Sequence, residues 1–354
     1  MKIVVLGGGV STERNVAQVT ATSVCQALRR RGHQAVYVDM FLGMENYDRP
    51  LEEAFSEPDG LCGNVEIRTE APDLRAVWES RKDRSPSRLG KNVIEICALA
   101  DCVFLGLHGR DGEDGKIQAI LEMIGVPYTG SGPLASALAM NKAMAKRVLE
   151  PQGMRTPAWQ ELYFEKEDIP DLVENLSVPC AVKIINGGSS LGVELPETKE
   201  ELKLALERIL EYGNHVIVEE KIYGREMTVP VLDGRALSPI EVVPPEGGAG
   251  FDYVAKYQSG ALGAREICPA SITAEEDRLL REAAEQVQRG LGLSVYSRSD
   301  FILDREGKVW FLEVNTLPGM TPNSLIPRAA RVEGLSYDEL CEKIVLLSLK
   351  EHRE

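Results

Sequence analysis

The sequence predicts a mixed α/β protein with more than one domain. Its 354 residues exceed the ~100–200 residues of a typical domain, so two or three domains that share a cleft are expected. Near the amino terminus, apolar strands alternate with helical segments, as they do in an open α/β sheet. Near the carboxyl terminus, strands joined by short turns predict an antiparallel sheet that carries helices.

The composition excludes several classes of protein. The chain is 44% hydrophobic and 27% charged, and no stretch approaches the ~18 consecutive apolar residues of a membrane helix. A net charge of −15 argues against a nucleic-acid partner, which needs a basic face. Seven cysteines without a C-x-x-C pair argue against a disulfide framework and a zinc site and predict a cytoplasmic protein. The first residues are expected to form a buried strand, not a targeting segment.

The first domain is expected to span residues 1–133. Its strands and helices follow from short apolar runs and from one long helical stretch after a glycine turn. Residues 43–92 have no clear period and are interpreted as a variable insertion. The expected elements lie at residues 2–6, 14–31, 35–39 and 102–107.

The central domain is expected at residues 134–224 and the carboxy-terminal domain at residues 225–354. Each contains a capping box, Thr198 with Glu201 and Thr273 with Glu276, which predicts a helix start. These helices are expected to run to about residues 212 and 291. The other expected elements are a helix at 134–149 and strands at 180–185, 215–220, 226–232, 236–243, 295–303 and 309–314.

A glycine turn, residues 7–9, follows the first strand and leads to Glu13. Glycines free backbone amides for an anion at a helix start, although an ordinary turn is an equal alternative. The turn lacks the G-x-G-x-x-G spacing of a dinucleotide site, which weakens an NAD-dependent oxidoreductase as an interpretation. Glu13 either holds a substrate ammonium group or complements the helix dipole.

Residues 108–118 form a second motif, with three glycines after a buried strand. Such a loop permits close backbone approach. His108 by itself is more often structural than catalytic, because nothing adjacent gives a metal-ligand spacing.

Lys183 ends an apolar strand and precedes a loop of small residues, 186–192. Burying a lysine without an anion is costly, so a phosphate partner is favoured over a solvated edge lysine. The loop can donate amides to phosphates, although its spacing is not that of a P-loop.

The most informative motif joins Arg298 and Asp300 through a hairpin to Glu313 and Asn315. Alternation along strands places each pair on one face of its strand. Two carboxylates and an amide suit Mg²⁺, which takes waters and phosphates as its remaining ligands. A cross-strand salt bridge is the alternative. The long loop at residues 244–265 is interpreted as a lid or as an ordinary solvent loop.

Together these residues resemble the D-alanine–D-alanine ligases of the ATP-grasp superfamily, over residues 2–347. The sequence departs from the family pattern at Asn141, where Asp is common, and at Lys221, where an aromatic residue is common. The segments that carry the resemblance are residues 108–118, 127–132, 188–192, 255–257 and 313–321.

The resemblance implies a three-domain ATP-grasp architecture, with ATP held between the central and carboxy-terminal domains. It also implies two Mg²⁺ ions, with Mn²⁺ as an alternative, at Asp300, Glu313 and Asn315. The residues expected around ATP are Lys142, Lys183, Glu219, Glu220, Ile222, Glu226 and Lys256.

For the amino-acid sites, the resemblance implies that Glu13 holds the first ammonium group, linked to Ser189 and Tyr257, with His108 beside it. Arg298 and the Gly319 amide would face the tetrahedral oxyanion, and Ser324 with Leu325 the second carboxylate. ATP would phosphorylate the first D-alanine, and the amine of the second would displace phosphate to give D-alanyl-D-alanine for peptidoglycan. A D-serine or D-lactate ligase and a non-catalytic ATP-grasp paralogue are the alternatives, and a homodimer is expected.

Overall fold

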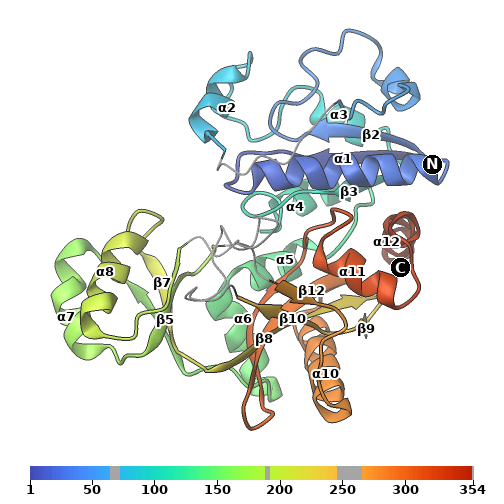
Figure 1. Cartoon of the computed structure of the whole chain (residues 1–354). Coiled ribbons are helices and arrows are strands. Elements are labelled where there is room, and N and C mark those ends of the chain that lie inside the picture. Colours follow the sequence, from blue (N-terminus) through green and yellow to red (C-terminus); the bar gives the residue numbers. More distant parts are fainter. Residues whose placement is uncertain (64–71, 188–191, 245–264, 353–354) are drawn as a thin grey trace.

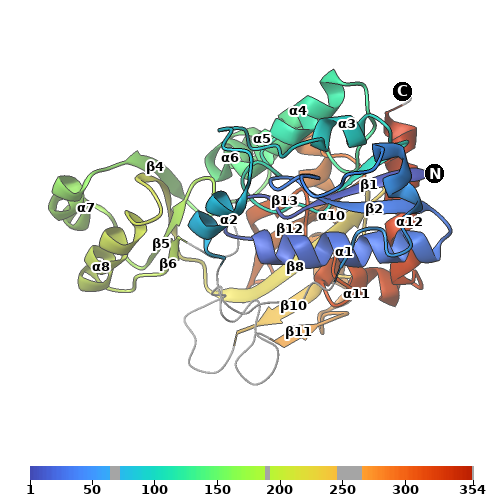
Figure 2. The same cartoon turned by 90° about the horizontal axis from the view of Figure 1, so that it is seen from above.

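The computed structural model describes residues 1–63, 72–187, 192–244 and 265–352. It contains a three-stranded, a four-stranded and a six-stranded sheet, so the predicted mixed α/β class is confirmed. The four-stranded sheet and its helices stand to one side of the other two sheets (Figures 1 and 2). Within the described ranges, no helix is both long and apolar enough to cross a membrane.

The amino-terminal sheet is parallel and has β1 (Lys2–Gly7) between β2 (Gln34–Asp39) and β3 (Cys102–Leu105). The predicted helix is α1 (Arg14–Arg30), which packs against β1 and β2. β3 ends two residues before the predicted limit. The remaining elements are η1 (Leu51–Ser56), α2 (Leu74–Ser80), α3 (Val93–Cys97) and α4 (Lys116–Met123).

The central sheet is antiparallel, and its two middle strands, β7 (His215–Glu220) and β5 (Cys180–Ile184), are the two predicted strands. Thr198 caps α8 (Lys199–Ile209) as predicted, but the predicted reciprocal bond is wrong, because the Glu201 carboxylate accepts from the amide of Glu197 over 2.7 Å. The other elements are β4 (Trp159–Tyr163), β6 (Val193–Glu194), η3 (Lys166–Asp168) and α7 (Ile169–Asn175).

The carboxy-terminal sheet is antiparallel as predicted, in the order β11-β10-β8-β12-β13, with β9 paired to β8. One strand was expected at residues 236–243, but Ser238 and Pro239 separate two short strands, because proline has no N–H for the ladder. The capping box of Thr273 and Glu276 is complete. The elements are β8 (Gly224–Leu232), β9 (Arg235–Ala236), β10 (Ile240–Val243), β11 (Arg265–Ile267), α10 (Ala274–Gly290), β12 (Tyr296–Asp304) and β13 (Val309–Asn315).

The single helix expected at residues 134–149 is wrong, because α5 (Pro133–Met140) ends before α6 (Lys142–Leu149) begins. Asn141 between them has extended backbone angles, φ −90° and ψ 103°, and its side chain accepts from the Met144 amide over 2.9 Å. The break makes Lys142 the first residue of α6. The short η2 (Glu150–Gln152) follows.

The last two helices, α11 (Leu325–Val332) and α12 (Tyr337–Glu351), return to the amino-terminal sheet. α12 packs against α1 and β3, so the two ends of the chain lie on the same side of the molecule (Figure 1). Leu340, Cys341, Ile344 and Val345 of α12 are fully buried in one core with β1, β2 and β3. The first and last parts of the chain therefore share a hydrophobic core.

Candidate functional site

Strands β12 and β13 bring the predicted metal ligands together. Asp300 pairs with Glu313 and Arg298 with Asn315 across the two strands. Asn315 Nδ2 lies 3.3 Å from Asp300 Oδ2. In the described part of the chain, no group of three or more His, Cys, Asp or Glu side chains is arranged to hold a metal. The site therefore offers two carboxylates and one amide, which fit an ion that also takes water and phosphate ligands.

A β-bulge decides which side chains of β13 reach this site. Phe311, Glu313 and Asn315 alternate in sequence and would share one face of a regular strand. The register shifts next to Asp300, and Phe311 instead packs against Phe301 in the core, with ring centroids 6.0 Å apart. The bulge thereby lets Glu313, and not Phe311, pair with Asp300.

The alternative of a salt bridge is also present in this structure. Arg298 Nε and Nη2 lie 3.1 and 3.0 Å from the two carboxylate oxygens of Asp300. Thr228 of β8 donates to Asp300 Oδ1 over 2.5 Å. Arg298 is only 6% exposed. It pairs with Asn315, the last residue of β13, so its side chain is buried beside the end of that strand.

Two lysines meet a buried glutamate between the central and carboxy-terminal sheets. Lys183 Nζ lies 2.6 Å from one oxygen of Glu219, and Lys146 Nζ lies 3.0 Å from the other. Lys146 also donates to the Phe311 carbonyl over 3.2 Å. Burial alone would raise the pKa of Glu219, but the attraction of the two lysines outweighs burial and lowers it.

The pKa values of the two lysines shift in opposite directions. Burial is the largest influence on each and favours the neutral amine, and it lowers the pKa of Lys146. For Lys183, the attraction of Glu219, with smaller contributions from Glu313 and Glu226, outweighs burial and raises the pKa. Lys183 is therefore a charged group at the edge of the candidate site.

Lys142 contacts both a predicted metal ligand and the loop that follows Lys183. Its Nζ lies 3.0 Å from Glu313 Oε2 and donates to the Gly187 carbonyl over 2.6 Å. A wider hollow elsewhere, of about 400 Å³, is lined by Met1, Asp101 and His352 and contains none of the predicted site residues. A narrow cavity lies beside Lys142 and Glu313. The narrow cavity is lined by Glu113, Ala139, Met140, Lys142, Gly187, Glu313, Val314, Asn315 and Thr316.

Glu13 precedes the first residue of α1 and lies against the loop after β3. Its amide donates to Ser11 Oγ over 3.2 Å, and Ser11 Oγ donates to the His108 carbonyl over 2.8 Å. A Cβ on Gly109, where φ is +68°, would stand 2.8 Å from Glu13 Oε2. The loop therefore needs glycine there to reach Glu13.

His108 is bonded through both ring nitrogens. Nδ1 lies 2.8 Å from the Leu317 carbonyl and Nε2 lies 3.0 Å from Thr20 Oγ1. Because a carbonyl only accepts, Nδ1 carries a proton. Both described partners of the ring, the Leu317 carbonyl and Thr20 Oγ1, belong to the chain itself.

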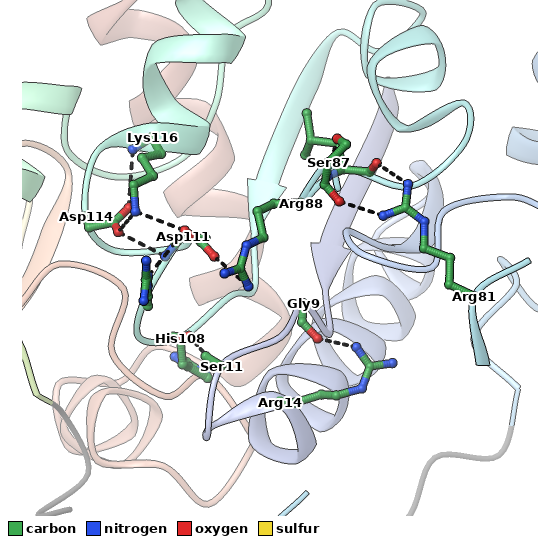
Figure 3. Close-up of polar contacts among 12 residues, drawn as sticks. Gly9, Ser11, Arg14, Arg81, Ser87, Arg88, His108, Asp111, Asp114 and Lys116 are labelled. Atoms are coloured by element: carbon green, nitrogen blue, oxygen red, sulfur yellow. Dashed lines mark hydrogen bonds and ion pairs between the residues drawn. The ribbon is translucent and has the colours of Figure 1, made fainter. Parts of the chain in front are cut away.

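The glycine turn is closed by side chains of its own domain. Arg14 donates to the Gly9 carbonyl (Figure 3), and it also pairs with Asp39. Arg88 of the predicted insertion reaches Asp111, with 3.7 Å between the nearest atoms (Figure 3). The insertion thus contacts the loop that carries His108.

The remaining predicted residues fall into three groups. Gly319 and Ser324 are neighbours, since a Cβ on Gly319 would lie 3.0 Å from Ser324 Oγ, and Ser324 precedes α11, whose first residue Leu325 is buried. Glu220 is exposed at the end of β7, Ile222 lies between β7 and β8, and Glu226 lies on β8. Ser189, Lys256 and Tyr257 lie outside the described residues, as do residues 245–264 of the lid predicted at 244–265, whose last residue, Arg265, begins β11.

Two residues of the site were not identified from the sequence. Lys146 is one helical turn from Lys142, a spacing that places both on one face of α6. Glu113 lies inside the motif at 108–118, and only its contacts show that it links two distant segments. Nothing local distinguishes Glu113 from the acids beside it.

Family models match both parts of the chain. Residues 2–131 match the model described as D-ala D-ala ligase N-terminus, and residues 148–346 match that described as D-ala D-ala ligase C-terminus. Among curated proteins, a D-alanine--D-alanine ligase of Lacticaseibacillus casei (strain BL23) is 39% identical over 99% of this chain and 96% of its own length. A D-alanine--D-alanine ligase from Pediococcus pentosaceus is 38% identical over 98% of this chain and 97% of its own length.

Solved structures give the same relationship. A D-alanine--D-alanine ligase from Bacillus anthracis complexed with ATP superimposes with a TM-score of 0.72 at 28% identity, covering 100% of this chain and 99% of that one. A D-Ala:D-Ser ligase from Enterococcus faecalis superimposes with a TM-score of 0.73 at 29% identity, covering 98% of this chain and 99% of that one.

Proposed function

The chain belongs to the D-alanine–D-alanine ligase family, and from that premise we propose that it joins two D-alanine molecules at the expense of ATP. The observation that carries the proposal is the pairing of Asp300 and Arg298 with Glu313 and Asn315 across β12 and β13, together with the contact of Lys142 with Glu313 at the narrow cavity. Phosphoryl transfer needs positioned cations and little else from the protein. ADP and phosphate are the other products.

The ATP phosphates lie, in this proposal, against Lys142 and Lys183. Glu219, on β7, forms an ion pair with Lys183 through one carboxylate oxygen and with Lys146 through the other. The adenine and ribose lie near Glu220, Ile222 and Glu226, and a backbone contact of Glu219 with adenine is part of the same proposal. Lys256 completes the phosphate contacts.

Asp300, Glu313 and Asn315 would hold Mg²⁺, two ions in this proposal, and their paired positions and oxygen donors support that assignment. Held there, Mg²⁺ would supply positive charge opposite the charge that develops on the phosphoryl group. Arg298 and Lys142, which contact Asp300 and Glu313 here, would turn toward the reacting oxygens as the carboxylates take up the ions. Mn²⁺ would satisfy the same donors.

The first D-alanine places its ammonium group against Glu13, beside Gly109. Arg298 and the Gly319 amide donate to the oxyanion of the tetrahedral intermediate, where charge develops. Ser324 and the amide of Leu325, at the start of α11, receive the second carboxylate. Ser189 and Tyr257 close the site over the acyl phosphate and exclude water.

The proposal includes the organisation of the chain. Domains 1–133, 134–224 and 225–354 remain proposed boundaries, as do a cytoplasmic location and a homodimer. The separate cores of the central and carboxy-terminal sheets support the second boundary.

A direct assay tests the proposed function. Purified protein receives ATP, Mg²⁺ and D-alanine, and phosphate release is measured together with the mass of the product. One phosphate for each D-alanyl-D-alanine is expected. Parallel reactions with D-serine or D-lactate as the second substrate identify another acceptor, and nucleotide binding without phosphate release would indicate a non-catalytic protein.

A further inference from the structure

One loop of the amino-terminal domain holds the peptide groups of Leu317 from two sides. His108 Nδ1–H donates to the Leu317 carbonyl over 2.8 Å, and the Leu317 N–H donates to Glu113 Oε1 over 3.1 Å. Both contacts are buried and join residues more than 200 positions apart. The Leu317 carbonyl and N–H are therefore both hydrogen-bonded to side chains of the amino-terminal domain.

The Glu113 carboxylate also stabilises its own loop. Its second oxygen accepts from the Gly109 amide over 2.7 Å, so one side chain holds two backbone amides of different segments. Glu113 is 8% exposed. Burial is the main cause, and the neighbouring Glu13 the next, of the rise in the pKa of Glu113 to about 8, against the opposing effect of the two amides and Arg298.

The segment after Leu317 leads directly to the proposed oxyanion donor. Met320, next to Gly319, accepts from the Tyr337 hydroxyl over 2.7 Å, and the Thr321 amide donates to Ser324 Oγ over 3.1 Å. The turn that contains Gly319 is thus fixed on its far side by its own domain. On its near side the described contacts come from His108 and Glu113.

We propose that Glu113, acting with His108, is a positioning residue that sets the Gly319 amide for the second chemical step. The inference rests on the proposed function, because it assigns Gly319 to the oxyanion of the amide-forming intermediate. A donor displaced by a fraction of an ångström stabilises that intermediate poorly. The acyl phosphate then persists and is lost to water, which returns D-alanine and phosphate.

Glu113→Gln tests the assignment with little change in volume. The amide group offers one acceptor and places N–H atoms toward the other backbone amide, so one of the two bonds is lost. We expect dipeptide formation to fall by about tenfold or more and phosphate released per dipeptide to rise from one to above two. The KM for ATP should stay within about twofold, because the phosphate contacts are elsewhere.

Thr20→Val is the matched control. It removes the other partner of His108, on α1, and leaves both bonds to Leu317 in place. Its rate and its ratio of phosphate to dipeptide should match the wild type within about twofold. If phosphate released per dipeptide rose as much in Thr20→Val as in Glu113→Gln, the cause would be a general loosening around His108 and not the loss of the bond to Leu317.

A second variant keeps the inference testable if Glu113→Gln does not fold. His108→Gln places an amide near the position of Nε2 and loses the donor to Leu317, and it should raise the same ratio. Where both variants fold, their combination should cost less than the product of the single effects, because both hold one peptide segment.

The outcomes separate the two proposals. A wild-type protein that makes no dipeptide contradicts the proposed function. A wild-type protein that is active, with a ratio of one in both Glu113→Gln and His108→Gln, overturns the positioning role while the ligase assignment stands. A loss of rate without any loss of coupling would also overturn it.

Discussion

Glu219 is the anion of a buried cluster whose cations come from two different elements. Its side chain is 1% exposed and that of Lys146 is 0% exposed. In such a place each charge depends on its partners, because removing one partner leaves an uncompensated buried charge. The cluster therefore makes the position of Lys183, and with it the proposed phosphate site, sensitive to a single carboxylate.

Glu219→Gln should destabilise the protein by about 3–5 kcal/mol and raise the KM for ATP, because two buried lysines lose their counter-charge. Urea unfolding and ATP-dependent kinetics measure the two effects. Glu197→Gln is the control, since it changes only surface contacts, those with Lys221 and the Tyr223 hydroxyl, and should leave both quantities unchanged. Equal behaviour of the two variants would contradict the role given to Glu219.

Glu113 should give the stability a pH dependence of its own. Its pKa is about 8 in the fold against an ordinary value of 4.5, so the folded state binds more protons between these values. The stability that it contributes is complete at low pH and is lost as the pH rises through about 8. Glu13, Arg298 and Tyr296 are among the ionisable groups that interact with it.

Thermal unfolding of wild type and Glu113→Gln from pH 4 to 9 checks this dependence. The wild type should lose stability relative to the variant as the pH rises from about 4.5 to about 8, and the difference should level off above that. Parallel curves would show that Glu113 titrates near its ordinary pKa and that its burial costs little.

At the scale of elements, interruptions in regular structure place the reactive groups. The bulge in β13 sends Phe311 to the core and leaves Glu313 and Asn315 beside Asp300. The break at Asn141 makes Lys142 the first residue of a helix, where its amide donates to the Ile185 carbonyl over 3.1 Å. A continuous helix or a regular strand would satisfy the same local preferences without assembling the site.

Asn141→Ala should remove the cap of α6 and cost about 0.5–2 kcal/mol. Because Lys142 is the next residue, we also expect a higher KM for ATP. Asn141→Asp should keep the cap, since a carboxylate accepts the same bond and suits the positive end of the helix. Thermal unfolding and ATP kinetics are measured for both variants. An equal loss of stability in Asn141→Ala and Asn141→Asp would argue that the Asn141 side chain does not cap α6.

At the scale of the whole molecule, the last helix completes the first domain. Arg30 of α1 makes a bidentate pair with Asp338 of α12, at 2.7 and 2.8 Å, at the edge of the shared core. The charged pair is exposed and is expected to contribute little. The buried face of α12 therefore carries the stabilisation, and unfolding of the amino-terminal and carboxy-terminal parts should be coupled.

Ile344→Ala should cost about 2–5 kcal/mol, as other large-to-small changes in cores do. Leu346 lies on the same helix but is 52% exposed, so Leu346→Ala should change stability by less than about 0.5 kcal/mol. Urea unfolding followed by circular dichroism compares the two. If Ile344→Ala cost no more than its control, α12 would not be part of the amino-terminal core.

The sequence by itself determined the classes of element, the family and the residue types that carry the chemistry. Alternation along β12 and β13 predicted that Arg298 and Asp300 would face Glu313 and Asn315, and the Thr273 capping box predicted the start of α10. These signals extend over a few residues, where backbone geometry allows few alternatives. The metal and substrate roles of these residues remain predictions.

Only the tertiary structure decided which distant groups meet. Glu113 and His108 reach Leu317, Lys146 reaches Glu219, and α12 enters the core of the first sheet. No local pattern encodes such contacts, because they depend on how the sheets and helices of the whole chain pack to bury their apolar faces. The same glutamate or lysine on a free surface would be an ordinary solvated charge, and burial beside a particular partner gives each of them its role.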